Sequence, residues 1–227
     1  RLSCHAELLD DVIIDVPPES QVHRQIIRKD AEHRDIQLNT ATRLYFVTLS
    51  ESTLEDARGE SKLLLEALSK EWALTDLTIE TSELVKLQTA LASGDRGVTV
   101  AVFESRKITG IWSGLFESPR GVAVDVGSTT VAAHLCDLAT GDVLSSASVM
   151  NPQIPFGEDL MSRVSYIMMH PEGAAAMSAA IQTALSKLFV ELTDQLGETT
   201  DNILEVSLVA NPIMHHLVLG INPINLG

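Results

Sequence analysis

The chain has 227 residues, of which 31 are acidic and 16 are basic, so its formal net charge is −15. This excess of negative charge repels phosphate backbones and anionic lipid, which argues against non-specific binding to nucleic acid or to a membrane surface. Hydrophobic residues make up 45% of the sequence, and no apolar run reaches the roughly 18 residues of a membrane span, so we expect a globular protein. The two cysteines, Cys4 and Cys136, form no disulfide framework and favour a reducing cytoplasm.

The first part of the chain divides into a short strand and a charged segment. The strand is the apolar run Val12–Val16, which two prolines end, so residues 1–18 are predicted to be the tail of a small domain that is cut at Arg1. Residues 19–37 are highly charged and poor in large apolar side chains. Because such a segment cannot bury a core, we predict that it is a linker.

Residues 38–118 are predicted to form a small α+β domain. Alternating apolar residues indicate three strands, at Leu44–Leu49, Gly97–Phe103 and Lys107–Trp112, of which the last two form a hairpin. Two helices lie between the first and second strands, and their leucines share one face: Leu64, Leu65 and Leu68 in the first, and Leu84, Leu87 and Leu91 in the second. No nucleophile, base and orienting residue are grouped here, so we expect a structural or docking role.

Residues 119–227 have a different pattern, with the element order β-β-β-α-α-β-α. The predicted strands are Gly121–Val126, Thr129–Leu138, Val143–Met150 and a buried strand at Ile203–Ala210. The longest helix carries apolar residues at three- and four-residue spacing: Met177, Ile181, Leu185, Leu188, Leu192 and Leu196. Asn211-Pro212 opens the last helix. The pattern indicates an α/β domain that is incomplete at Gly227.

The motif with the clearest chemistry is Asp125-Val126-Gly127-Ser128-Thr129-Thr130, at the end of an apolar strand. Gly127 allows a tight turn and a close approach to a ligand. Ser128, Thr129 and Thr130 offer hydroxyls and successive backbone N–H groups to an anion. Asp125 is an acceptor that can bind the water shell of Mg²⁺ or orient an attacking water. The chain lacks the P-loop and Rossmann glycine motifs, so we predict a phosphate-binding hairpin.

These features resemble the actin-like (ribonuclease H-like) ATPase superfamily and, more closely, the reductive activators of corrinoid-dependent enzymes. The string around Gly127 is generic to the superfamily, whereas the Asn-Pro-Gln loop and the helix after it are typical of the activators. The resemblance lies at these positions: Arg1–His5, Gly121–Thr130, Asn151-Pro152-Gln153, Phe156–Asp159, Ser162-Arg163, Asn211, Met214, His216-Leu217 and Leu219-Gly220.

The resemblance implies an order of domains and a function. Residues 1–18 would be the tail of a [2Fe–2S] ferredoxin-like domain, 19–37 the linker, 38–118 the α+β middle domain, and 119–227 the first half of the ATPase domain. The implied activity is ATP-dependent reduction of a corrinoid protein, or a corrinoid-dependent methyltransferase, from Co(II) to Co(I). ATP, Mg²⁺ and a [2Fe–2S] cluster are the implied cofactors, the cluster supplies the electrons, and a homodimer is compatible with this scheme.

The resemblance also assigns residues. Asp125 would be catalytic, Gly127, Ser128, Thr129 and Thr130 would bind the ATP phosphates, and Cys4 would be a cluster ligand. The other three ligands are absent from the chain, which therefore cannot hold the cluster by itself. We expect the second phosphate loop and the adenosine pocket beyond Gly227, so that this fragment alone is inactive.

Two other classes of protein fit parts of the sequence. A small-molecule kinase of the acetate or sugar type has the same ATPase fold, but it has no place for the charged linker or the ferredoxin-like tail. A non-enzymatic actin-like module is the third option. The sequence departs from the activators at Ala210–Ile213, which puts a ligand role for that loop in doubt. His215 with His216, and His134 with Cys136, make poor metal sites and are predicted to be structural.

Overall fold

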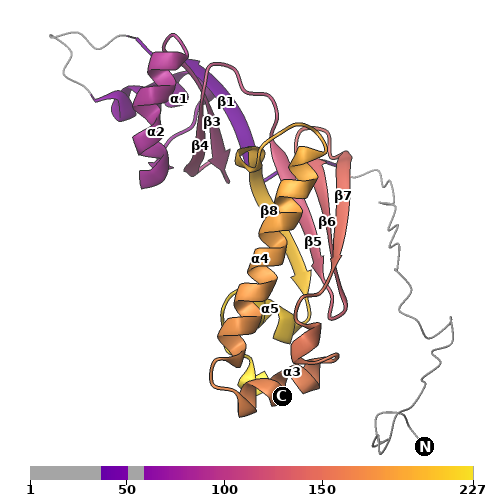
Figure 1. The fold of residues 1–227 in the computed structure, drawn as a ribbon. Coiled ribbons are helices and arrows are strands. Elements are labelled where there is room, and N and C mark those ends of the chain that lie inside the picture. The colour runs from indigo at the N-terminus through magenta and orange to yellow at the C-terminus, as the bar shows by residue number, and fades with distance from the viewer. Residues whose placement is uncertain (1–36, 51–58, 227) are drawn as a thin grey trace, which may run out of the picture. The chain divides into compact units, whose positions relative to one another are not determined.

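The computed structural model describes residues 37–50 and 59–226, and these contain two four-stranded sheets (Figure 1). The first sheet has the strand order β1-β3-β4-β2, with β1, β3 and β4 antiparallel and β2 parallel to β4. Its strands are β1 (Thr42–Thr48), β2 (Thr78–Ile79), β3 (Gly97–Phe103) and β4 (Lys107–Ser113). Two helices accompany it, α1 (Glu60–Trp72) and α2 (Thr81–Ser93).

The core of this first part follows from alternation in the strands and from the leucines of the helices. Its fully buried members are Val47, Leu64, Leu68, Leu87, Leu91, Val98, Val100, Val102 and Ile108. The predicted hairpin is confirmed, since β3 pairs antiparallel with β4. One prediction is wrong: Leu84 is 45% exposed, because the buried stripe of α2 runs through Glu83, Leu87 and Ala90–Leu91, and Leu84 lies outside it.

The second sheet has the strand order β7-β6-β5-β8. The first three strands form an antiparallel meander, and β8 joins β5 in parallel. Its strands are β5 (Arg120–Val126), β6 (Thr130–Asp137), β7 (Val143–Met150) and β8 (Ile203–Ala210). The helices are α3 (Leu160–Met169), α4 (Gly173–Asp194) and α5 (Pro212–Val218), with short 3₁₀ turns at η2 (Ile154–Phe156), η3 (Thr200–Asn202) and η4 (Ile224–Leu226). The predicted element order and the mixed α/β fold class are confirmed.

The long helix α4 covers one face of the second sheet, as Figure 1 shows. Side chains alternate along a strand, so every second residue of β5 and β6 faces this helix. Together they form the core: Val122, Val124, Val126, Val131, Ala133, Leu135, Ile181, Leu185, Leu188, Leu192 and Met214. The helix ends at Asp194, so the predicted core member Leu196 lies beyond it and is exposed.

The prediction of a buried strand at Ile203–Ala210 is wrong in its burial. The strand exists with these bounds, but Val206 is 50% and Val209 is 61% exposed. Within the described residues β8 pairs only with β5, so it is the edge of the sheet. A continuous apolar run indicates a strand but does not show what covers it.

One helix of the described residues is long and apolar enough to cross a membrane by composition alone, namely α4, with a mean hydropathy of 1.2 over its most apolar window. The expectation from apolar runs did not find it, because polar residues interrupt the sequence at intervals. Its largest apolar side chains are packed against β5, β6 and α5. One face of α4 is thus buried against its neighbours, and 33% of the apolar window is buried.

An ion-pair network clamps the start of β5. Arg120 donates to Asp137 Oδ2 at 2.6 Å and to both carboxylate oxygens of Glu198 at 2.6–3.2 Å. Asn202 also donates to Glu198, at 3.1 Å. The hydrogen bonds from Arg120 lower the pKa of the Glu198 carboxyl below its ordinary value of 4.5. The network ties the segment before β8 to the paired ends of β5 and β6.

This network predicts an acid-dependent stability. Because the pKa of Glu198 is lower in the folded state, its contribution is present above pH 4.5 and is lost as the pH falls through the lowered value. We therefore expect Glu198→Gln to destabilise the chain at pH 7 and to differ much less from the wild type near the acid end of the titration. Urea unfolding at several pH values measures the difference in the free energy of unfolding between the variant and the wild type. Glu191→Gln, at an exposed position, is the control. A difference between Glu198→Gln and the wild type that did not change with pH would contradict the prediction.

Candidate phosphate-binding hairpin

The predicted phosphate-binding motif forms the turn between β5 and β6. Gly127 N donates to Thr130 O at 3.0 Å, which closes the turn. A β-carbon at Gly127 would lie 2.7 Å from Thr130 O, a distance that real β-carbons do not tolerate. The turn therefore depends on glycine for a close approach of backbone to backbone. β6 begins at Thr130, one residue later than predicted.

Three successive carbonyl groups of this turn accept hydrogen bonds from two residues that follow β7 in the chain. Asn151 donates to Gly127 O through its side-chain amide at 2.7 Å and to Thr129 O through its backbone N–H at 2.8 Å. Arg163 Nη2 donates to Ser128 O at 2.5 Å. Both supporting side chains are buried. The carbonyls of residues 127–129 are thus held by one loop and one helix.

The direction of the N–H groups follows from this support. The described backbone contains no cis peptide, and in a planar trans peptide the C=O and N–H bonds point in opposite directions. The N–H groups of Ser128, Thr129 and Thr130 share peptide planes with the three supported carbonyls. They are therefore directed away from Asn151 and Arg163. These three N–H groups are thus the backbone donors that the turn could offer to an anion.

Asp125 lies on the face of the sheet opposite α4. Val124 and Val126 belong to the core beneath α4, so the residue between them points to the other face. Its register partners are Ala132 on β6 and Val209 on β8. Asp125 is half-buried there, two residues before the turn glycine. The structure thus brings the predicted acceptor and the predicted phosphate-binding turn to one end of β5.

The Asn-Pro-Gln loop is held by its own hydrogen bonds. Gln153, fully buried, donates its backbone N–H to Asn151 Oδ1 at 2.9 Å. Its side chain donates to Met177 O of α4 at 3.0 Å. These bonds fix Asn151 in the position from which it supports the hairpin. The Asn-Pro-Gln sequence is thus explained by the shape of the loop.

A capping box orients the helix that carries Arg163. Asp159 accepts from Ser162 N at 2.8 Å, and Ser162 Oγ accepts from Asp159 N at 3.3 Å. Gly157 adjoins this turn so closely that a β-carbon there would lie 2.7 Å from Arg163 N. These residues carried the family resemblance in the sequence, but that resemblance gave them no role. Their spacing as a capping box, from Asp159 to Ser162, was the available signal.

The remaining predicted residues have structural surroundings or lie elsewhere. Cys4 lies outside the described residues. His134 Nδ1 bonds Ser146 Oγ at 2.7 Å, and His216 Nδ1 bonds Pro212 O at 2.8 Å. Burial raises the pKa of the half-buried Cys136 thiol. The described residues contain no group of three or more side chains suited to a metal ion.

The doubtful loop at Ala210–Ile213 has a structural use. The Asn211 side chain accepts from Met214 N at 3.0 Å and caps α5, and Pro212 occupies the first turn. The side chain of Asn211 is therefore already hydrogen-bonded to the helix that follows it.

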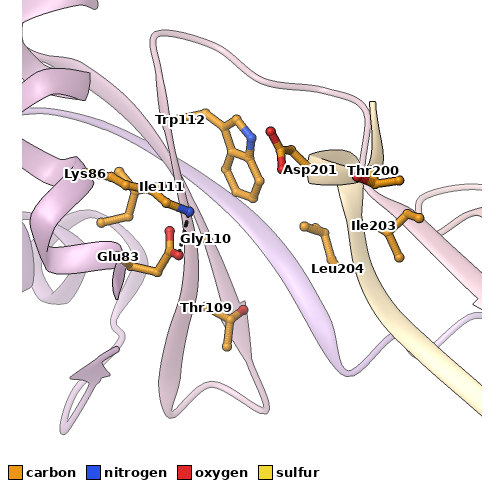
Figure 2. Close-up of a pocket in the computed structure, with 10 residues that line it drawn as sticks. All are labelled: Glu83, Lys86, Thr109, Gly110, Ile111, Trp112, Thr200, Asp201, Ile203 and Leu204. Carbon is orange, nitrogen blue, oxygen red and sulfur yellow. Dashed lines mark hydrogen bonds and ion pairs between the residues drawn. The ribbon is translucent and has the colours of Figure 1, made fainter. Parts of the chain in front are cut away.

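A polar pocket of about 430 Å³ lies apart from the hairpin (Figure 2). Its lining includes the ion pair of Glu83 and Lys86, at 2.8 Å, together with Trp112 and Asp201. None of the predicted phosphate-binding residues lines it. The pocket is therefore separate from the predicted phosphate-binding turn.

The close approach at Gly127 gives a direct test of the turn. Gly127→Ala places a β-carbon against a backbone oxygen, so we expect a loss of about 1–3 kcal/mol in the free energy of unfolding. Urea unfolding measures it. Gly59→Ser is the control, because a β-carbon there comes no nearer than 4.0 Å to any of the described residues and serine suits its N-cap position. Equal stability of the Gly127→Ala variant and the wild type would show that the turn relaxes freely.

Comparisons with known proteins agree with this architecture. Residues 31–118 match the family model of the RACo linker region, and residues 120–227 match that of the RACo middle region. The chain is 34% identical over 107 residues to the corrinoid activation enzyme RamQ of Eubacterium limosum. This aligned stretch covers 47% of this chain and 18% of RamQ.

A solved structure is similar as well. It is a reductive activator for a corrinoid, iron–sulfur protein, with a TM-score of 0.71 and 29% sequence identity. The match covers 85% of this chain and 31% of that one, so the chain spans less than a third of either relative. In the family's own terms, the part with β1–β4 is the linker region and the part with β5–β8 is the middle region. The chain belongs to the RACo family and carries its linker and middle regions.

Proposed function

We propose that this chain is part of an ATP-dependent reductive activator of corrinoid proteins, and that its hairpin binds the phosphates of ATP. The observation that carries the phosphate site is the hairpin itself. Its three carbonyls are held from behind by Asn151 and Arg163, which directs the following N–H groups toward the opposite side. The hydroxyls of Ser128, Thr129 and Thr130 add further donors. This is the donor set that a phosphate group requires.

Asp125 would serve the same site as an acceptor. A carboxylate at the end of a strand, beside a phosphate-binding turn, can hold the water shell of Mg²⁺ or orient the attacking water. The geometry fits this role, because Asp125 lies on the face of the sheet that α4 does not cover. Mg²⁺, when bound, would neutralise part of the phosphate charge. Asp125 itself would fix the position of a water molecule and would not cradle phosphate.

The reductive part of the proposal rests on the relatives. Both are named as corrinoid activators, and one acts on a corrinoid, iron–sulfur protein. By this reasoning the partner is a corrinoid protein or a corrinoid-dependent methyltransferase, which the complete protein would return from Co(II) to Co(I) in the cytoplasm. A [2Fe–2S] cluster, held in part by Cys4, would supply the electron. Hydrolysis of ATP would make this uphill transfer proceed.

The kinase alternative has less support. A small-molecule kinase would belong to the same ATPase superfamily, but it gives no account of residues 31–118, which match the linker region of the activators. The same match argues against an isolated actin-like module. The activator is therefore the function that accounts for most of the chain.

The proposed role of Asp125 predicts a loss of activity without a loss of cluster. In the complete protein, Asp125→Ala should lower ATP hydrolysis and ATP-dependent reduction of Co(II) corrinoid by about 10²-fold or more, because a group beside the transferred phosphate is removed. Iron content should not change. The spectrum of the corrinoid during single turnovers measures the reduction.

Two further variants decide whether Asp125 acts through its charge. Asp125→Asn keeps a side chain of similar shape and should be nearly as inactive. Asp142→Ala, in the exposed turn between β6 and β7, is the control and should be fully active. If the Asn variant hydrolyses ATP at the wild-type rate, Asp125 has no catalytic role.

The proposed role of Cys4 predicts a loss of cluster. In the complete protein, Cys4→Ala should remove the red-brown absorption of a [2Fe–2S] centre and its iron, since cluster sulfur ligands come from cysteine thiolates. Cys136→Ala is the matched control, because Cys136 lies in β6 and should keep the full iron content. Full cluster occupancy in the Cys4 variant would remove this residue from the ligand set.

A further inference from the structure

We propose that Arg163 is a positioning residue for the phosphate site: its buried guanidinium sets the direction of the hairpin N–H groups and favours the phosphate-bearing ligand over the bare nucleoside. This inference rests on the proposed binding of ATP at the hairpin. It extends that proposal to a residue that does not contact the ligand directly.

Arg163 is fully buried, with 0% of its surface exposed. Its Nε donates to Gly157 O at 2.9 Å, and Nη2 donates to Ser128 O. Nη1 faces Gln153 Oε1 at 3.4 Å and the sulfur of Met214. The guanidinium thus joins the hairpin, the loop after β7 and helix α5. Such a set of contacts determines its position in the protein.

These hydrogen-bond partners are neutral oxygens and a sulfur, and none is a carboxylate. The carboxyl of Asp159 acts on Arg163 through space, but it lies at the surface of the helix cap. A buried cation is costly unless negative charge compensates it. An anion bound on the other side of the Ser128–Thr129 peptide would provide that compensation. Arginine stays protonated under all ordinary conditions, so the charge is permanent.

The peptide between Ser128 and Thr129 connects the two sides. Arg163 binds its carbonyl, and its N–H points the opposite way. A cation at the carbonyl polarises the peptide and makes its N–H a better donor, since hydrogen bonds in a chain strengthen one another. Asn151 does the same, without charge, for the two neighbouring peptides. Arg163 therefore supplies the one charged contact in this support among the described residues.

The test compares ATP with adenosine in the complete protein. Arg163→Met should weaken ATP binding about ten- to a hundredfold, the loss expected for a charge-assisted hydrogen bond, and should change adenosine binding by less than about twofold. Calorimetry measures both affinities. The matched control is Val164→Ala on the same helix, which removes buried packing but no charge. It should lower the melting temperature without changing the ratio of the two affinities.

The outcomes separate this inference from the proposed function. Loss of ATP and adenosine binding in equal proportion, or an unchanged ATP affinity, would overturn the role of Arg163 while the ATP site stands. A wild-type protein that does not bind ATP would overturn the site and the inference together. If Arg163→Met does not fold, Arg163→Gln decides, because glutamine can donate a hydrogen bond but carries no charge. It should lower the ATP-to-adenosine preference relative to Val164→Ala, and an unchanged preference would count against the proposal.

Discussion

Support of the hairpin carbonyls is the interaction on which the second part of the structure depends. In the turn after β5, the carbonyls of residues 127–129 accept their hydrogen bonds from Asn151 and Arg163. For these two residues to reach it, the chain must leave β7 in a tight loop and begin α3 at a fixed angle. The loop hydrogen bonds of Gln153 and the capping box of α3 meet these two requirements.

Burying such a polar network is costly unless each member is satisfied. Three buried side-chain atoms of the described residues have no hydrogen-bond partner, and they belong to Thr42, Glu83 and Arg96. All three lie in the first part of the structure, outside the network. Asn151, Gln153 and Arg163 are paired with backbone carbonyls or with one another. A fully paired network of this kind holds a single arrangement, which a site for a small anion requires.

Sequence patterns predicted most of the fold, because apolar alternation and leucine spacing report directly on strands and helices. They failed where burial depends on neighbours distant in sequence: β8 has an apolar run like a central strand, yet it forms an edge. The hairpin was predictable from Gly127 and the hydroxyl residues after it. The role of Arg163 was not, since nothing local shows that a residue 35 positions away donates to Ser128 O. Only the family resemblance marked it, and that resemblance gave no physical reason.

Strand β5 is held at both ends. At its start, Arg120 joins β6 and the segment before β8 through Asp137 and Glu198. At its far end, the hairpin is fixed to the loop after β7 and to α3. The strand is therefore anchored at both ends and paired along its length with β6 on one side and β8 on the other. Such a strand cannot shift without its two neighbours, so the segments that connect this sheet to the rest of the chain are the places where hinge motion is expected.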